Sequence, residues 1–78
     1  MNVSILSPLK SLFQGEATSV KLPGKVGAFT ILENHAPIVS TLDKGVITIA
    51  KDEEISEIEI VSGFVEVHDN VITICVEQ

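Results

Sequence analysis

The sequence has few of the residues that enzymes, metal sites and nucleic-acid-binding surfaces depend on. It contains no arginine, tyrosine or tryptophan, only one cysteine and only three phenylalanines. The lone Cys75 excludes a disulfide within the chain, and the two histidines do not stand at a zinc-ligand spacing from it. Eleven acidic residues against five lysines exclude the basic surface that nucleic acid requires. We therefore expect no nucleic-acid partner, no metal and no cofactor.

Long apolar runs are also missing. No stretch approaches the roughly 20 apolar residues that span a bilayer, and the N-terminus lacks the basic region of a secretory signal. We expect a chain that does not insert into the bilayer and stays in the compartment where it is made. Its 78 residues make a single domain, 1–78. So short a chain buries only about 60% of its unfolded surface, which favours support from a partner surface.

What the sequence does contain is a hydrophobic period of two residues. Ile58 and Ile60, for example, alternate with Glu57 and Glu59, as in a strand with one face on a core. Residues 45–50 and 71–76 are apolar on nearly both faces and are expected to be central or covered. We expect strands at residues 3–7, 16–22, 28–32, 37–42, 45–51, 55–62, 64–68 and 70–76, with a further short one at 12–13. This pattern predicts an all-β fold, an antiparallel β-sandwich of two packed sheets with about eight to ten short strands.

Turn-forming residues separate the expected strands. Leu22-Pro23-Gly24 is predicted to be a tight turn, residues 51–54 a charged hairpin tip, and Asp69-Asn70 a two-residue loop. Pro8 and Pro37 should mark edges or strand beginnings, where a missing N–H costs nothing. Cys75 lies in an apolar pattern and is expected to be a buried structural thiol.

Candidate chemistry is sparse. His35 has no evident nucleophile or orienting partner, so we expect its ring to tie down a loop by hydrogen bonds beside Ala36-Pro37, or to contact a partner. His68 precedes a turn and is expected to be exposed. Lys25 follows Gly24, but the glycine and the Ser or Thr of a phosphate loop are missing around it. We interpret the remaining acidic pairs as solvated hairpin charge rather than a cation site.

Asp43-Lys44-Gly45 supports one competing interpretation. A lysine on an exposed hairpin near the middle of an all-β domain resembles the modified lysine of lipoyl and biotinyl carrier domains. By this alternative, Lys44 would carry a lipoyl or biotinyl group. It leaves the runs 34–37 and 63–67 unexplained.

A second resemblance covers essentially the whole chain. The order and spacing of its short motifs are similar to those of the N-terminal β-sandwich of the epsilon subunit of the rotary F-type ATP synthase. The motifs are Leu12-Phe13-x-Gly15, Leu22-Pro23-Gly24, Gly27-Ala28-Phe29-Thr30-Ile31-Leu32, Asn34-His35-Ala36-Pro37, Leu42-Asp43-Lys44-Gly45 and Gly63-Phe64-Val65-Glu66-Val67.

The resemblance implies a non-catalytic rotor subunit. Such a subunit links the gamma subunit to the polar loops of the c-ring, and so couples proton-driven rotation to ATP synthesis. It is peripheral to the membrane on the cytoplasmic side in bacteria and is not an obligate homo-oligomer. Carried over by motif, the ring-facing loop runs from Gly24 to Glu33, and the next residues shape that loop and the gamma contact. The implied partner-binding residues are Gly24, Gly27, Ala28, Phe29, Glu33, Asn34, His35 and Pro37.

Two departures from the family pattern lead to further expectations. Ala28 stands where the family usually has glutamate, so we hypothesise that Glu33 supplies that charge to a basic ring loop. Most family members continue into a two-helix hairpin that restrains ATP hydrolysis, whereas this sequence ends at Gln78. The expectation is a short form that couples rotation but lacks that brake.

Overall fold

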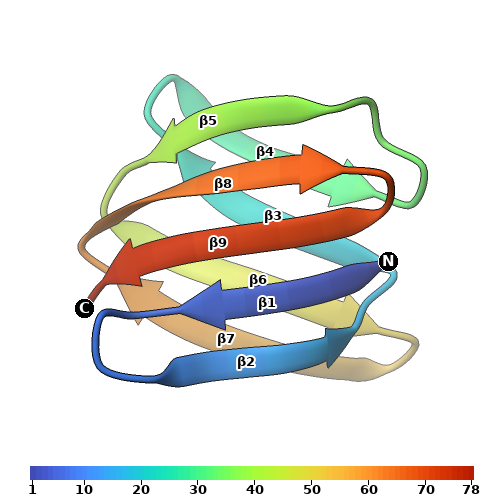
Figure 1. The fold of residues 1–78 in the computed structure, drawn as a ribbon, viewed down its shortest axis with the longest axis horizontal. Coiled ribbons are helices and arrows are strands. Elements are labelled where there is room, and N and C mark those ends of the chain that lie inside the picture. The colour runs from blue at the N-terminus through green and yellow to red at the C-terminus, as the bar shows by residue number, and fades with distance from the viewer.

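A computed structural model describes residues 1–78 as nine strands joined by short turns (Figure 1). The strands are β1 (Asn2–Leu6), β2 (Ser11–Glu16), β3 (Ser19–Gly24), β4 (Gly27–Leu32), β5 (Ile38–Leu42), β6 (Gly45–Lys51), β7 (Glu54–Ile60), β8 (Ser62–His68) and β9 (Val71–Glu77). This confirms the predicted all-β fold. No helix is present that could span a membrane.

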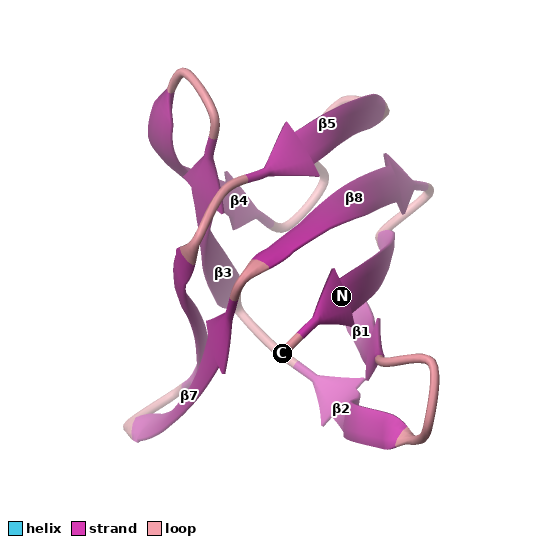
Figure 2. Ribbon diagram, turned by 90° about the vertical axis from the view of Figure 1, so that its left-hand side faces the viewer, coloured by secondary structure: helices cyan, strands magenta, loops and turns pink.

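The strands form two layers that are joined along one side (Figure 2). One layer has the order β2-β1-β9-β8-β5, and the other is built from β4, β3, β6 and β7. A single bridge between Gly24 of β3 and Leu42 of β5 connects the layers, so the sandwich is also one strongly curled sheet. The predicted central positions of residues 45–50 and 71–76 are confirmed, because β6 lies between β3 and β7, and β9 lies between β1 and β8.

The expectation of a wholly antiparallel arrangement was wrong at one place. β1 pairs with β9 in parallel, with Val3 opposite Ile72 and Ile5 opposite Ile74. The first and last strands both run toward the same end of the molecule, and almost the whole chain connects them. No short-range signal marks such a pair, because parallel strands need a long connection.

The core lies between the layers and is entirely hydrophobic. Its sixteen buried residues include no polar or charged side chain. Inward-facing residues of every strand except β2 supply it, in alternation where a strand contributes more than one, as the two-residue period predicts. From the first layer come Val3, Ile5, Val65, Val67, Ile72, Ile74 and Val76; facing them are Val20, Leu22, Ile31, Ile47, Ile49 and Ile60. Each fully buried aliphatic side chain stabilises the fold by about 1.5–3 kcal/mol relative to an exposed one.

Several predicted turns are confirmed. Asp69 and Asn70 form a two-residue loop with φ angles of 50° and 61°. Asp52, at the charged tip between β6 and β7, also has a positive φ. Pro8 lies in the turn after β1 and Pro37 immediately precedes β5.

The predicted turn at Leu22-Pro23-Gly24 was wrong. Pro23 and Gly24 continue β3 and pair with Ala28 and Gly27, so the turn consists of Lys25 and Val26. A proline is tolerated here because β6 pairs only with the first half of β3, which leaves no ladder bond for Pro23 to donate on that side.

The region of the second strand also differs from the prediction. The tentative strand at 12–13 is the complete strand β2, and the expected strand 16–22 is interrupted at Ala17-Thr18. Leu12 and Phe13 both pack partly against the core. Their adjacency obscures the alternation that would have marked the strand.

Because the strands alternate in direction along the chain, the turns gather at two opposite ends (Figure 1). One end carries the turns 7–10, 25–26, 43–44 and residue 61, and we call it the Lys25 end. The other carries Met1 and the segments 17–18, 33–37, 52–53 and 69–70, and we call it the Met1 end.

Candidate partner-binding surface

The eight residues implied by the resemblance do not form one surface. Gly24, Gly27 and Ala28 lie at the Lys25 end, whereas Glu33, Asn34, His35 and Pro37 lie at the Met1 end. Phe29 lies within β4 and packs partly against the core. The expected loop from Gly24 to Glu33 is therefore a hairpin tip followed by a strand. From Ala28 to Glu33 the strand advances five residues at about 3.3 Å each, so the two groups lie about 16 Å apart.

At the Lys25 end, two glycines shape the hairpin tip. A Cβ on Gly24 would lie 2.7 Å from the carbonyl oxygen of Gly27 and 2.8 Å from the ring of Phe29. Gly27 has a φ of 145°, which L side chains rarely adopt. These two positions bring the strands together closely enough for Lys25 and Val26 to project alone, and Val26 is completely exposed.

At the Met1 end, the segment 33–37 is held by a pair of asparagines. The backbone N–H of Asn34 donates to Oδ1 of Asn70 at 2.6 Å, and Nδ2 of Asn70 donates to Oδ1 of Asn34 at 2.8 Å. Both residues have left-handed backbones, with φ angles of 64° and 61°. Asn70 was missed as a site residue, because nothing in the sequence links it to a segment 36 positions away.

His35 behaves as predicted from the sequence. Its Nδ1 lies 2.7 Å from the carbonyl oxygen of Ala36, and its backbone N–H donates to the carbonyl of Leu32 at 3.2 Å. The histidine therefore stiffens its own loop. Together with Pro37, Asp69 and the asparagine pair, it lines an open polar depression of about 380 Å³. His68 is exposed, as expected, with its Nδ1 3.3 Å from a carboxylate oxygen of Asp69.

Glu33 does not lie where the hypothesis about its charge requires. Its carboxylate is 3.7 Å from the amino nitrogen of Met1, which also lies 3.7 Å from the carboxylate of Glu16. Glu33 is thus at the opposite end of the molecule from Ala28 and cannot supply a charge to the same contact. The surface around Ala28 carries Lys25 instead.

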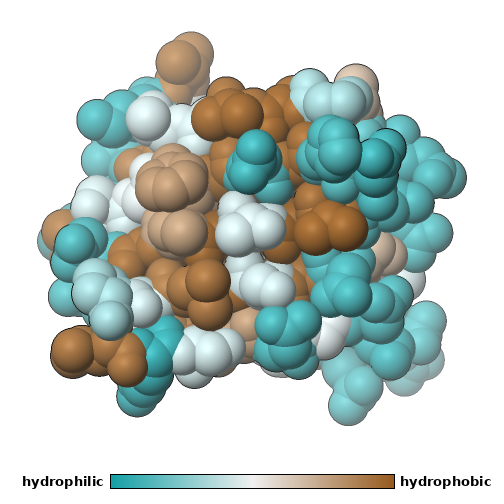
Figure 3. Space-filling view, in the orientation of Figure 1, coloured by the Kyte–Doolittle hydropathy of each residue, from teal (hydrophilic) through white to brown (hydrophobic).

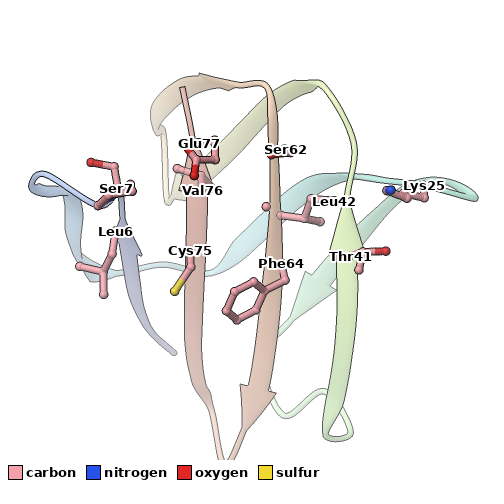
Figure 4. Close-up of a pocket in the computed structure, with 12 residues that line it drawn as sticks. Leu6, Ser7, Lys25, Thr41, Leu42, Ser62, Phe64, Cys75, Val76 and Glu77 are labelled. Atoms are coloured by element: carbon pink, nitrogen blue, oxygen red, sulfur yellow. The ribbon is translucent and has the colours of Figure 1, made fainter.

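An apolar groove crosses the outer face of the β5-β8-β9-β1 layer (Figure 4). Leu6, Cys75, Phe64 and Thr41 stand side by side on four neighbouring strands, as the register of the sheet requires. The groove has a volume of about 600 Å³, and Lys25, Pro8 and Glu77 line it where it meets the Lys25 end. Figure 3 shows apolar groups on this sheet face between polar ones.

Two residues of the groove, Cys75 and Phe64, were not predicted to lie there. Cys75 is partly exposed at the groove rather than buried, because Ile74 and Val76 take the inward positions of β9. Phe64 is 48% exposed. The sequence did carry a signal for this, since Val65 and Val67 point into the core and the residues that alternate with them must point outward.

Lys44, the site of the alternative interpretation, is exposed in the turn between β5 and β6, where its backbone N–H donates to the carboxylate of Asp43 at 2.9 Å. Elsewhere, no three His, Cys, Asp or Glu side chains come together in an arrangement that could hold a metal ion.

Comparison with known proteins identifies a family for the complete chain. The profile of the family described as "ATP synthase, Delta/Epsilon chain, beta-sandwich domain" matches residues 1–78. The ATP synthase epsilon chain of Leptospira borgpetersenii is 47% identical over 78 residues, which are all of this chain and 61% of that protein. That of Thermosynechococcus vestitus is 38% identical over 76 residues, 97% of this chain and 55% of that protein. The chain thus spans about three fifths of the length of these relatives.

Two solved structures share the fold. A chain in the central stalk and c-ring structure of the Tetrahymena thermophila mitochondrial ATP synthase superimposes with a TM-score of 0.86 at 20% identity, covering all of this chain and 63% of that one. A chain of the Euglena gracilis mitochondrial ATP synthase gives 0.90 at 18% identity, covering 97% and 49%. At these identities the likeness concerns the fold. The full-length match to the family profile, supported by relatives of up to 47% identity, shows that this chain belongs to the β-sandwich domain family of the ATP synthase delta and epsilon chains.

Proposed function

We propose that this chain is the β-sandwich of an ATP synthase epsilon subunit that acts as a non-catalytic part of the rotor. It links the gamma subunit to the c-ring, so that ion-driven rotation reaches the nucleotide sites elsewhere in the complex. The subunit is peripheral to a bacterial membrane, on its cytoplasmic side, as part of the ATP synthase. The observation that carries the proposal is the family match over residues 1–78, together with relatives named as epsilon chains.

The architecture suits a mechanical role. A wholly apolar core without a buried polar side chain makes a stiff body. Such a body transmits torque through its surfaces.

In this proposal, different parts of the surface contact different partners. The Lys25 end, with Gly24, Gly27 and Ala28 shaping its hairpin tip, faces the c-ring. The segment 33–37 continues into β5, where Val39 is 74% exposed beside β8. That segment and the adjoining sheet face, including Phe64, contact the gamma subunit.

Binding to gamma tests the proposal. The full-length subunit is expected to form a stable complex with the gamma subunit of the same organism, and to turn over no nucleotide alone. Val39→Asp places a charge on the proposed contact and is expected to weaken the complex at least about tenfold.

Ile55→Asp is the matched control, because Ile55 is 66% exposed but lies on β7 in the opposite layer. It is expected to leave the affinity unchanged. If the subunit does not bind gamma, the proposal is wrong. If the two variants weaken the complex equally, this assignment of the surface is wrong.

A further inference from the structure

Three of the nine strands, β2, β4 and β7, pair with a neighbour on one side only. An unpaired strand edge presents N–H and C=O groups to which another chain can add a strand, and proteins guard such edges with charge or irregularity. β7 carries Glu54, Glu57 and Glu59 along its length. β2 is irregular, because its register against β1 shifts between Ile5 and Leu6. These two edges are therefore guarded.

The edge of β4 has none of these guards. From Gly27 to Leu32 the strand contains no charged residue and no proline, and its pairs with β3 follow one register without a bulge. Thr30, near its middle, is exposed, and Leu32 is 58% exposed. In Figure 1 the strand borders the rear layer at the top. The free edge of β4 is thus accessible, regular and uncharged.

The register of the hairpin shows which backbone groups this edge presents. Gly24 and Gly27 close the two-residue turn, so they form a hydrogen-bonded pair, and such pairs alternate along an antiparallel ladder. Every second residue of β4, starting from Gly27, therefore bonds to β3. The others direct their N–H and C=O groups toward the free edge, and they are Ala28, Thr30 and Leu32. Of these groups only the carbonyl of Leu32 is already used, because it accepts the backbone N–H of His35 at 3.2 Å.

These three residues make the edge complementary to itself. When two such edges pair in antiparallel about a two-fold axis at Thr30, Thr30 meets its own copy and Ala28 meets Leu32 of the other copy. All of these positions are then hydrogen-bonded pairs. The same register brings the hairpin tip that carries Lys25 to the end where Glu33 of the other copy lies. The edge therefore has a neutral centre and opposite charges at its two ends, which is the arrangement that a second copy matches.

We infer that the free subunit forms a two-fold dimer in which β4 pairs with β4 of a second copy. The inference goes beyond the proposed function and does not depend on it. A contact through one six-residue strand is smaller than the about 1,200–2,000 Å² that stable interfaces bury, and each copy has a net charge of −6. The dimer is therefore expected to be weak, with a dissociation constant on the order of 0.1 mM. Ala28 also belongs to the proposed ring contact, so dimer formation and ring binding exclude each other.

Sedimentation equilibrium of the full-length subunit, from about 10 μM to about 1 mM at roughly 0.15 M salt, tests the inference. The unaltered subunit is expected to change from monomer to dimer over this range. Thr30→Lys places two like charges opposite each other on the two-fold axis and is expected to weaken the dimer at least about tenfold. Ser56→Lys is the matched control, because Ser56 is exposed on β7 at the opposite edge of the same layer. It is expected to keep the dissociation constant within about twofold.

A cross-link tests the position of the contact. In a Cys75→Ser background, Thr30→Cys lies on the two-fold axis and is expected to join two copies through a short bismaleimide. Ser56→Cys in the same background is expected to give no cross-linked dimer. A subunit that stays monomeric at every concentration overturns the inference. So does equal cross-linking of the two cysteine variants, or an equal dissociation constant for Thr30→Lys and Ser56→Lys.

Binding to gamma, measured in parallel, distinguishes this result from the proposed function. A subunit that dimerises through β4 but does not bind gamma supports the inference and overturns the proposed function. If the subunit alone stays monomeric while Thr30→Lys weakens the gamma complex, the inference is overturned and the edge of β4 is a contact for gamma instead.

Discussion

Asn34 and Asn70 bind each other through two hydrogen bonds, 2.6 Å and 2.8 Å long, across loops that are 36 residues apart. Each residue has the left-handed backbone that its own turn requires. The same two residues thus shape two turns and join them. This pair orients the segment that leads into β5, on which the proposed gamma contact depends.

Two substitutions of Asn70 distinguish the stability that comes from its side-chain hydrogen bonds from the stability that comes from its tolerance of a positive φ. Asn70→Gly keeps the positive φ but removes the amide, and we expect it to lower the free energy of unfolding by about 1 kcal/mol. Asn70→Ala also strains the backbone and should lose about 1–2 kcal/mol more. Urea denaturation measures both values. Asp69→Gly serves as control, because Asp69 shares the backbone conformation without bonding to Asn34; a loss as large as that of Asn70→Gly would argue against the pair.

Gly63 is predicted to be intolerant of any side chain. A Cβ there would lie 2.5 Å from the carbonyl oxygen of Cys75 in the neighbouring strand β9. We expect Gly63→Ala to cost about 1–3 kcal/mol, because β8 and β9 would have to separate locally. Gly15→Ala is the matched control within β2, where the nearest atom, in the ring of Phe13, is 3.6 Å away. It should be nearly neutral in thermal unfolding, and similar melting temperatures for the two variants would contradict this packing.

Truncation in the core should be far more costly than truncation on the outer surface. Ile74 of β9 is completely buried, and Ile74→Val should cost about 0.5–1.5 kcal/mol and Ile74→Ala about 2–5 kcal/mol. The total stability of a domain is only about 5–15 kcal/mol, so the alanine variant should be largely unfolded at moderate urea. Ile55→Ala, on the exposed start of β7, should change stability by less than about 0.5 kcal/mol. Circular dichroism during denaturation distinguishes these cases.

The partly exposed Cys75 should react in the folded protein. A small alkylating reagent is expected to modify it without denaturant, more slowly than in the unfolded chain, because Leu6 and Phe64 flank the sulfur in the groove. Phe64→Ala should open the groove and raise the rate. Mass spectrometry over time follows the reaction. If the thiol reacts only after unfolding, Cys75 is buried in the folded protein and this prediction is wrong.

Features governed by short-range rules were predictable from the sequence. The two-residue period correctly identified the all-β fold and the central places of β6 and β9, and Asp69-Asn70 was recognised as a turn because these side chains tolerate a positive φ. The same rules failed at Pro23, where the proline continues a strand at a place without a ladder partner. They also failed at β2, where Leu12 and Phe13 are adjacent apolar residues that both pack partly on the core.

The sequence by itself determined the fold class, the family and several of the turns, since a two-residue period, short motifs and turn chemistry are read within a few neighbouring residues. Only the tertiary structure decided that β1 and β9 pair in parallel, and that Asn34 and Asn70 join two turns by hydrogen bonds. The physical reason is that these relationships join residues far apart in the chain. Their geometry follows from how strands pair and sheets curl, and no local pattern encodes that.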